Sequence, residues 1–307
     1  MSLPSLMRSR AGLLAVSGAG LLWGTTGVAV RVIQDHSALS AVSIGCYRLA
    51  ISAVVLTVVL HTAVLRRIRQ AWHSNRAALL ISGAGLGIYQ ALYFIGVQDV
   101  GVSVSTLISL GLAPIVLTIA SAVRDRRAPA MAAVVTVLCA VGGLALVTLS
   151  AGGNSDTAPH PVIGVLASIA SGVGYAFVTV VNRKLVHDGD VLSLTAATSG
   201  IGAVVLLPIA LAYGMAVPSS AVANGWLLYI GIFPTVAAYW LFYSGLRSTP
   251  TEVAGVLTLL EPLTAALLAA AFLDESLSTA GWIGTGLLLA AIAALYARKA
   301  EAEPAPL

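Results

Sequence analysis

Ten apolar runs of about 20 residues divide this chain, and they constrain its fold more than any other feature. A helix of roughly 20 residues crosses about 30 Å of hydrocarbon. The runs are continuous, whereas a membrane-barrel strand alternates with a two-residue period. Only 9% of the 307 residues are charged, far fewer than the roughly 25% of a soluble domain. We therefore predict an all-α polytopic membrane protein with ten transmembrane helices, at residues 11–31, 40–61, 77–97, 101–123, 129–149, 162–182, 191–213, 223–246, 251–273 and 279–297.

The Lys and Arg residues predict the orientation of these spans. With a cytoplasmic N-terminus, 14 of the 16 basic residues fall in inner segments, Arg31 falls outside and Arg48 lies within a span. Because cytoplasmic loops are rich in Lys and Arg, we expect both termini to be cytoplasmic. The basic residues form short groups between spans and not one basic face, so a nucleic-acid partner is excluded. The expected partners are the lipid bilayer and a small-molecule substrate.

The two halves of the chain show an internal repeat. The matched pairs are Gly12 and Gly164, Gly20 and Gly172, and Trp23 and Tyr175 for a shift of 152 residues, and Phe94 and Phe242, and Pro114 and Pro262 for a shift of 148. We predict two five-helix repeats at 11–149 and 162–298, an extracytoplasmic linker at 150–161 and a cytoplasmic tail at 299–307. Because five is odd, the repeats are inverted, as in many secondary transporters that bind substrate near the midplane.

Three short motifs, taken in order, resemble a known family. They are Arg48 in the second span, the pair Glu261-Pro262 in the ninth, and the acidic turn at 273–278. Together they resemble EamA-type members of the drug/metabolite transporter superfamily over residues 11–298. The resemblance implies a polytopic carrier without a bound cofactor, in many bacterial members an exporter of amino acids or other small metabolites. The first repeat departs from the pattern, with Ala113 where the second has Glu261, so no individual member's substrate is carried over.

Two charged residues lie well inside predicted spans, where a charge is costly and usually faces a cavity or a partner. Glu261 is about ten residues into the ninth span, and Pro262 beside it removes a backbone N–H. Glu261 is therefore either a protonatable or substrate-binding group or a structural carboxyl that bonds backbone groups freed by the proline. Arg48 either binds a substrate carboxylate or phosphate or ties helices together through backbone carbonyls.

Aromatic residues at mid-depth are the other candidates. Four-residue spacing puts Tyr89 and Tyr93 on one helix face, and Tyr239 and Tyr243 on another. Lining a pocket competes with plain helix packing for each of them. The predicted substrate-binding residues are Trp23, Arg48, Tyr89, Tyr93, Tyr175, Tyr239, Tyr243 and Glu261. We interpret the neutral polar residues Gln90 and Asn182 as packing residues.

Proline interrupts several spans, and such breaks are tolerated where a helix faces protein or a cavity. Pro114 and Pro262 are related by the repeat. We predict that they are paired hinges for alternating access.

The leading function is a secondary transporter, an exporter of small organic metabolites such as amino acids or amphipathic drug-like solutes. No Gly-x-x-x-x-Gly-Lys-Ser/Thr loop is present, so coupling is expected to be to protons or to the solute's own gradient. We predict no enzyme activity, no cofactor and no metal, because the five His and two Cys residues lack metal-ligand spacing.

The alternative is an integral membrane lipid-linked transferase. That chemistry needs clustered carboxylates for a metal or His/Asp/Ser sets, and the acidic pairs here, Asp188/Asp190 and Asp274/Glu275, lie in loops. Arg outnumbers Lys 14 to 2, which indicates a GC-rich bacterial genome. We therefore expect a multi-pass protein of the bacterial inner (plasma) membrane.

Overall fold

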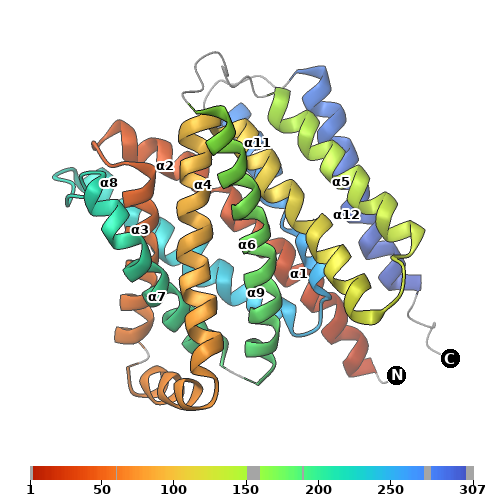
Figure 1. Ribbon diagram of the computed structural model, residues 1–307, viewed down its shortest axis with the longest axis horizontal. Helices are drawn as coiled ribbons and strands as arrows, with labels where there is room; N and C mark the ends of the chain where they lie inside the picture. Colours follow the sequence, from red (N-terminus) through yellow and green to blue (C-terminus); the bar gives the residue numbers. More distant parts are fainter. Residues whose placement is uncertain (1–2, 60, 151–159, 189, 273–277, 302–307) are drawn as a thin grey trace.

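The structure, a computed structural model, describes residues 3–59, 61–150, 160–188, 190–272 and 278–301 (Figure 1). These residues form helices and no strands, which confirms the predicted all-α class. The elements are α1 (Leu3–Gly24), α2 (Thr26–Asp35), α3 (Ala41–Val59), α4 (His61–Asp125), α5 (Met131–Ser150), α6 (Pro161–Asp188), α7 (Val191–Ala212), α8 (Ala221–Gly231), the π-helix η1 (Ile232–Ala237), α9 (Ala238–Leu246), α10 (Thr251–Leu257), α11 (Leu260–Phe272) and α12 (Thr279–Glu301). The linker residues 151–159, the acidic pair Asp274 and Glu275, and residues 302–307 lie outside the described ranges.

Nine segments of the described chain are long and apolar enough to cross a membrane. Large apolar side chains are exposed on their outer faces; Val58, Val123 and Val162, for example, are 70%, 71% and 70% exposed. Exposed apolar surface on this scale is explained by contact with lipid. The chain is therefore a multi-pass membrane protein.

One of the nine segments, Leu65–Asp125, is 61 residues long. A straight helix of that length would measure about 90 Å, about three times the hydrocarbon thickness. Gly101 interrupts it with φ 82° and ψ 163°, a left-handed φ that favours glycine. Figure 1 shows the chain reversing direction there, between the gold and the yellow limbs of α4. The predicted helices 77–97 and 101–123 fall on either side of this reversal, while the total of ten spans stays a prediction.

A second break divides α4 at Asn75, whose φ is −143° and ψ 37°. We call residues 61–74, 76–100 and 102–125 the first, second and third segments of α4. In Figure 1 the first segment, in orange, lies across the lower ends of α3 and of the second segment. The start of α1 and the end of α12 lie at the same lower edge, and the Gly101 reversal lies at the upper edge.

Three of the spans are broken near their middle. The first breaks between α1 and α2 at Thr25, whose hydroxyl donates to the Leu22 carbonyl at 2.7 Å. In the span that contains Pro234, the Thr235 hydroxyl donates to the Ile230 carbonyl at 2.7 Å, and the local turn widens to a π-helix.

The break between α10 and α11 follows from Pro262. This residue lacks the N–H that would reach the Thr258 carbonyl one turn earlier. The Glu261 N–H bonds that carbonyl instead, at 2.9 Å. The helix therefore restarts at Leu260, next to Glu261.

Contacts in the two halves correspond to one another. A Cβ at Gly20 would lie 3.1 Å from the Leu257 carbonyl oxygen, and one at Gly172 would lie 2.5 Å from the Ser109 carbonyl oxygen. Gly20 and Gly172 are related by the shift of 152 residues, and Ser109 and Leu257 by the shift of 148. Both glycines therefore allow the same close approach of two helix backbones, α1 to α10 and α6 to the third segment of α4.

The other helix pairs correspond in the same way. Gly83 packs against Ile201, and Gly231 packs against Ile51. At the opposite end of the molecule α5 packs against α12, where Gly143 and Gly284 each approach the other's carbonyl oxygen. These contacts between the two halves thus have partner contacts with the roles of the halves exchanged.

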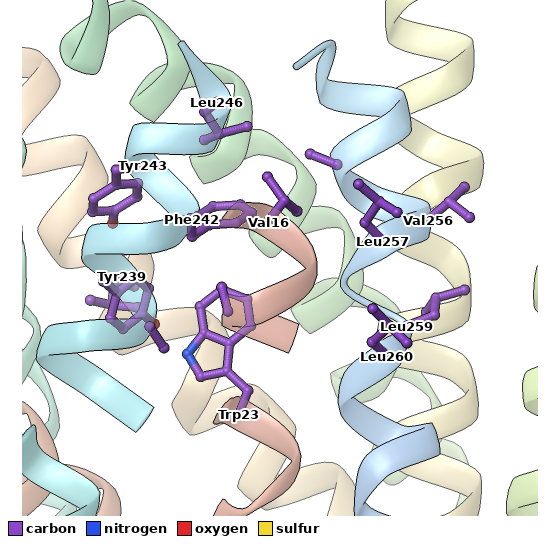
Figure 2. Close-up of a cluster of buried hydrophobic side chains, with 14 of the residues drawn as sticks. Val16, Trp23, Tyr239, Phe242, Tyr243, Leu246, Val256, Leu257, Leu259 and Leu260 are labelled. Carbon is purple, nitrogen blue, oxygen red and sulfur yellow. The ribbon is translucent and has the colours of Figure 1, made fainter. Parts of the chain in front are cut away.

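The buried core lies where α1, α9 and α10 meet. Figure 2 shows Phe242, Tyr243 and Leu246 on α9, Val16 and Trp23 on α1, and Leu257 on α10. The rings of Trp23 and Phe242 have centroids 5.2 Å apart. This cluster forms a tightly packed layer between the lower edge of the molecule and the cavity described next.

Candidate functional site

A cavity of about 550 Å³ lies at the centre of the helices. We call it the central cavity. Its walls come from α1, α2, α3, the second and third segments of α4, α5, α6, α8, α9 and α11. Both halves of the chain therefore contribute to it, and seven of the eight predicted substrate-binding residues line it, namely Trp23, Arg48, Tyr89, Tyr93, Tyr175, Tyr239 and Glu261.

The central cavity reaches the upper side of the molecule. Arg31 and Gln34, near the end of α2, line it, as do Val97 and Val102 on the two sides of Gly101. Arg31 and Val102 are exposed, Val102 to 62%. In Figure 1 the end of α2 and the reversal within α4 lie opposite the start of α1 and the end of α12. The cavity is therefore open on the upper side. Further along α9 from Tyr239, the core residues Phe242, Tyr243 and Leu246 are at most 2% exposed and do not line it, so this packed layer closes its other side.

Arg48 and Gln90 form a polar pair on one wall of the cavity. Arg48 Nη2 donates to Gln90 Oε1 at 3.0 Å. Gly45, one turn before Arg48, makes this pairing possible, because a Cβ there would lie 2.9 Å from Phe94 and 3.7 Å from Gln90 Oε1. A side chain at Gly45 would push the second segment of α4 away from α3.

Two donors of this pair have no partner. Arg48 Nε and Gln90 Nε2 are buried and form no hydrogen bond, and Gln90 is only 5% exposed. Buried donors are almost always paired, because an unpaired one costs about 1–3 kcal/mol. Both residues line the central cavity, so the two unpaired donors lie at its wall.

Glu261 lies on another wall, at the start of α11. Its carboxylate makes no hydrogen bond or ion pair within the part of the chain that the structure describes. The backbone carbonyl freed by Pro262 is bonded by the Glu261 amide and not by its carboxylate. Arg48 and Glu261 are close enough to interact electrostatically but form no direct ion pair at 4 Å or less. Apart from Arg31 at its exposed upper end, the cavity thus holds one positive and one negative group, separated and facing the same space.

Aromatic rings form the lower end of the central cavity. The rings of Trp23 and Tyr239 pack edge to face with centroids 5.3 Å apart, and those of Tyr89 and Tyr175 at 5.6 Å. The Tyr89 and Tyr239 hydroxyls lie 3.4 Å apart. Tyr93 forms a 2.8 Å hydrogen bond with Thr106. These tyrosines present an aromatic surface with few free hydrogen-bonding groups.

Tyr243 lies outside the lining, behind Tyr239. It is 1% exposed and accepts a hydrogen bond of 3.1 Å from Asn182 Nδ2. Asn182 accepts in turn from the Ser82 hydroxyl. Tyr243 and Tyr239 share one face of α9, as their four-residue spacing predicts, and their ring centroids are 5.5 Å apart. That face extends from the cavity into the tightly packed layer beside it. The contact between Ser82, Asn182 and Tyr243 therefore belongs to the closure and not to the cavity wall.

The two predicted hinge residues take different places. Pro262 lines the cavity. Pro114 packs against α10 instead, where a Cβ at Gly255 would lie 3.2 Å from Pro114 Cα. Pro114 therefore supports the helix that precedes the break at Thr258, and Pro262 follows that break.

Two features of this region were not predicted from the sequence. Gln90 was interpreted as a packing residue, although it is the single amide of the span 77–97 and lies on the same helix as Tyr89 and Tyr93. The ion pair between Arg67 and Asp190, 2.6 Å long, joins the first segment of α4 to the start of α7. A pairing between groups so far apart in sequence leaves no local signal. Within the described ranges no three His, Cys, Asp or Glu residues are grouped as metal ligands would be.

A helical membrane protein whose broken spans surround a cavity open to one side has the architecture of a solute transporter. The EamA-like transporter family matches this chain over residues 10–149 and again over 162–297. The chain belongs to this family, as the motifs around Arg48 and Glu261 predicted.

Relatives with transporter names support this membership. The uncharacterized transporter YwfM of Bacillus subtilis (strain 168) is 32% identical over 274 residues, which cover 88% of each chain. The uncharacterized inner membrane transporter YicL of Salmonella typhimurium is 24% identical and covers 92% of this chain and 94% of its own length. A solved crystal structure with 20% identity matches 96% of this chain and 99% of its own at a TM-score of 0.76, which shows a shared fold. The protein is a membrane transporter.

Proposed function

We propose that this transporter is a secondary carrier that exports small organic solutes, such as amino acids or amphipathic drug-like compounds, across the bacterial inner membrane by alternating access. The observation that carries the proposal is the pair of unbonded buried donors, Arg48 Nε and Gln90 Nε2, in a cavity that also holds Glu261 and an aromatic wall. Such donors are costly in the empty site and gain a partner when a solute binds.

The cavity suits a solute with two opposite poles. A carboxylate accepts from Arg48 and Gln90, since charge-assisted hydrogen bonds from Arg are strong and directional. An ammonium or other cationic group faces Glu261. The apolar part of the solute lies against Trp23 and Tyr239, because aromatic faces attract both apolar groups and cations. These three contacts assign a substrate-binding role to the predicted residues that line the cavity; Tyr243 acts behind Tyr239.

Ten spans in two inverted five-helix repeats explain the corresponding contacts of the two halves. The reversal at Gly101 supports two spans within α4. The matched pairs at Gly20 and Gly172 support repeats at 11–149 and 162–298, joined by the linker at 150–161 and followed by the tail at 299–307. With cytoplasmic termini, the open side of the cavity faces outward. When each repeat adopts the packing that the other repeat has in this structure, the cavity opens inward. Switching between the two arrangements is alternating access.

Helix breaks next to the cavity supply the bending points. Pro262 follows the break at Thr258, and Pro114 holds α10, which precedes it. Together they form one hinge region around α10 during the exchange. Substituting both prolines by alanine is expected to lower the transport rate with little change in the affinity for solute; unchanged transport kinetics would contradict this role.

Protons are the coupling ion that the site supports, because Glu261 is the carboxylate in the cavity wall. Export then follows when a proton and the solute use Glu261 in alternation. The Glu261→Gln substitution is expected to remove the pH dependence of transport. Glu252→Gln is the matched control, since Glu252 lies at the start of α10 away from the cavity lining. A Glu261→Gln variant with full transport and an undiminished pH dependence would exclude this coupling.

Solute flux in proteoliposomes tests the proposed function. Purified protein is screened for counterflow of amino acids, nucleosides and cationic amphipathic compounds. Saturable counterflow that is lost in Arg48→Gln and partly retained in Arg48→Lys supports the proposal. Flux that does not saturate, or product formation from a lipid-linked donor without flux, contradicts it and favours the transferase alternative.

A further inference from the structure

We propose that the first segment of α4, residues 61–74, is an interfacial helix that binds the headgroup of an anionic phospholipid through Arg66 and Arg69. This inference concerns the membrane surface and does not depend on the identity of the transported solute. The segment is separated from the span that follows it by the break at Asn75. In Figure 1 it lies across the ends of α3 and of the second segment of α4, at the edge where α1 begins.

One face of the segment is fixed against the protein. Ile68 packs on the small core cluster of Leu56 and Ala196, and Ala71 packs on the main core. Arg67 forms its 2.6 Å ion pair with Asp190. These contacts set the rotation of the helix, so its other residues point away from the body of the protein.

The outward face combines apolar and basic residues. Leu65 and Trp72 are 43% and 41% exposed and seven residues apart, so they lie along one line of the helix. Arg69 lies beside this line. Arg66, three residues before Arg69, lies next to it on the side away from Trp72, about 120° around the helix from Trp72. Exposed Trp next to Arg is typical of a helix at the boundary of headgroups and acyl chains.

The charge around this face is entirely positive. Arg66, Arg69, His73 and Arg76 are exposed, and no ion pair involves them within the described part of the chain. The sequence from residue 36 to residue 98 contains no Asp or Glu. The general preference for basic cytoplasmic loops explains the sign of this charge. Arg69 lies beside Trp72 and Arg66 lies beside Arg69, so a basic strip borders the apolar line, as an anionic headgroup held beside its own acyl chains requires.

Lipid binding by the purified full-length protein tests the proposal. Native mass spectrometry measures the affinity for phosphatidylglycerol and for phosphatidylcholine in wild type and variants. Because each basic residue that contacts the headgroup contributes about 1 kcal/mol, a factor of about 5 in affinity, the R66Q/R69Q variant is expected to bind phosphatidylglycerol about 30-fold more weakly. The matched control R126Q/R127Q removes two exposed arginines from the turn after α4 and is expected to change the affinity by less than about 3-fold.

Two further measurements separate lipid recognition from general charge and from misfolding. Trp72→Ala keeps every charge and is expected to weaken phosphatidylglycerol binding while leaving the weak phosphatidylcholine binding almost unchanged. Glycerol phosphate in solution is expected not to compete, because it lacks acyl chains. Equal losses in the two arginine double variants, an unchanged affinity in Trp72→Ala, or full competition by glycerol phosphate would each overturn the proposal. If R66Q/R69Q does not fold, R66K/R69K and Trp72→Ala still decide the outcome: R66K/R69K keeps both charges and should bind like wild type.

Discussion

Gln90 is the residue at which the proposed binding site is most directly tested. Its side chain does two things: Oε1 accepts from Arg48 Nη2 at 3.0 Å, and Nε2 lies buried without a partner in the cavity wall. The Gln90→Leu substitution keeps a side chain of similar size and removes both functions. Arg48 then loses the neighbour that orients its guanidinium, and a bound carboxylate loses one donor.

The size of the effect follows from these two hydrogen bonds. A hydrogen bond to a charged group contributes about 1.5–3 kcal/mol, and a neutral donor about 0.5–1.5 kcal/mol. The carboxylate loses one donor outright and loses only part of the contribution of Arg48, which stays in place. We therefore expect solute binding to weaken by about 2 kcal/mol, or roughly 30-fold.

Isothermal titration of the purified protein with a solute found in the counterflow screen measures this change. The matched control is Gln98→Leu, because Gln98 is exposed, accepts from the Tyr213 hydroxyl and does not line the cavity. An analogue of the solute without its carboxylate should bind wild type and Gln90→Leu with equal affinity. Two results would contradict this assignment: Gln90→Leu binds the full solute as tightly as wild type, or its binding of the analogue is weakened as much as its binding of the solute. In either case Gln90 does not bind the carboxylate.

Three further predictions concern the close packing of α6 on α4, the ion pair at Asp190, and the side to which the central cavity opens. Gly172→Ala places a Cβ 2.5 Å from a backbone carbonyl oxygen and should destabilise the protein by about 1–3 kcal/mol in thermal unfolding. The control Gly142→Ala, where nothing lies within 4 Å, should leave stability unchanged. Equal stabilities of the two variants would refute the close approach at Gly172. Burial alone would raise the pKa of Asp190, but hydrogen bonds from Ser193 and the charge of Arg67 outweigh burial and lower that pKa. The contribution of Asp190 to the stability of the fold should therefore persist above about pH 4 and disappear as the pH falls through the lowered pKa. In thermal unfolding at pH 7, Asp190→Asn keeps the helix cap and should cost less than about 1 kcal/mol, and Asp190→Ala about 1 kcal/mol more; identical variants would argue against the cap. In a variant without the native cysteines, Thr106→Cys should react in intact cells with a thiol reagent that does not cross membranes. Protection by a transported solute would support solute binding in the central cavity. No reaction from outside would contradict an outward opening.

The sequence predicted the helices well because their signals are local. Continuous apolar runs set the spans, and the glycine that reverses α4 stands between two of them at Gly101. The charges within spans were equally informative, since Arg48 and Glu261 had to face a cavity or each other in so apolar a chain. Both line the central cavity, where the structure keeps them apart.

The remaining features depend on contacts between distant residues, which a single sequence does not encode locally. Tyr243 and Tyr239 have the same spacing signal, yet one is 1% exposed behind the cavity and the other lines it. Depth along a helix decides between the two, and it depends on how α9 packs against α1. The unpaired donors of Arg48 and Gln90 likewise appear only when α3 and α4 meet across Gly45.

The scaffold is nearly symmetric, whereas its chemistry is not. Ile51 and Ile201 make equivalent contacts with Gly231 and Gly83, so the position equivalent to Arg48 is Thr198, whose hydroxyl bonds the Leu194 carbonyl of its own helix at 2.9 Å.

The position equivalent to Glu261 is Ala113, which is 1% exposed and outside the cavity lining. Arg48 and Glu261 therefore each lack a charged counterpart in the other half, so below the exposed Arg31 the cavity has one positive wall and one negative wall. A symmetric pair of charges would bind a solute equally in two orientations. One charge of each sign fixes one orientation, so in the proposed alternating access the site opens to the other side while the solute keeps the same contacts.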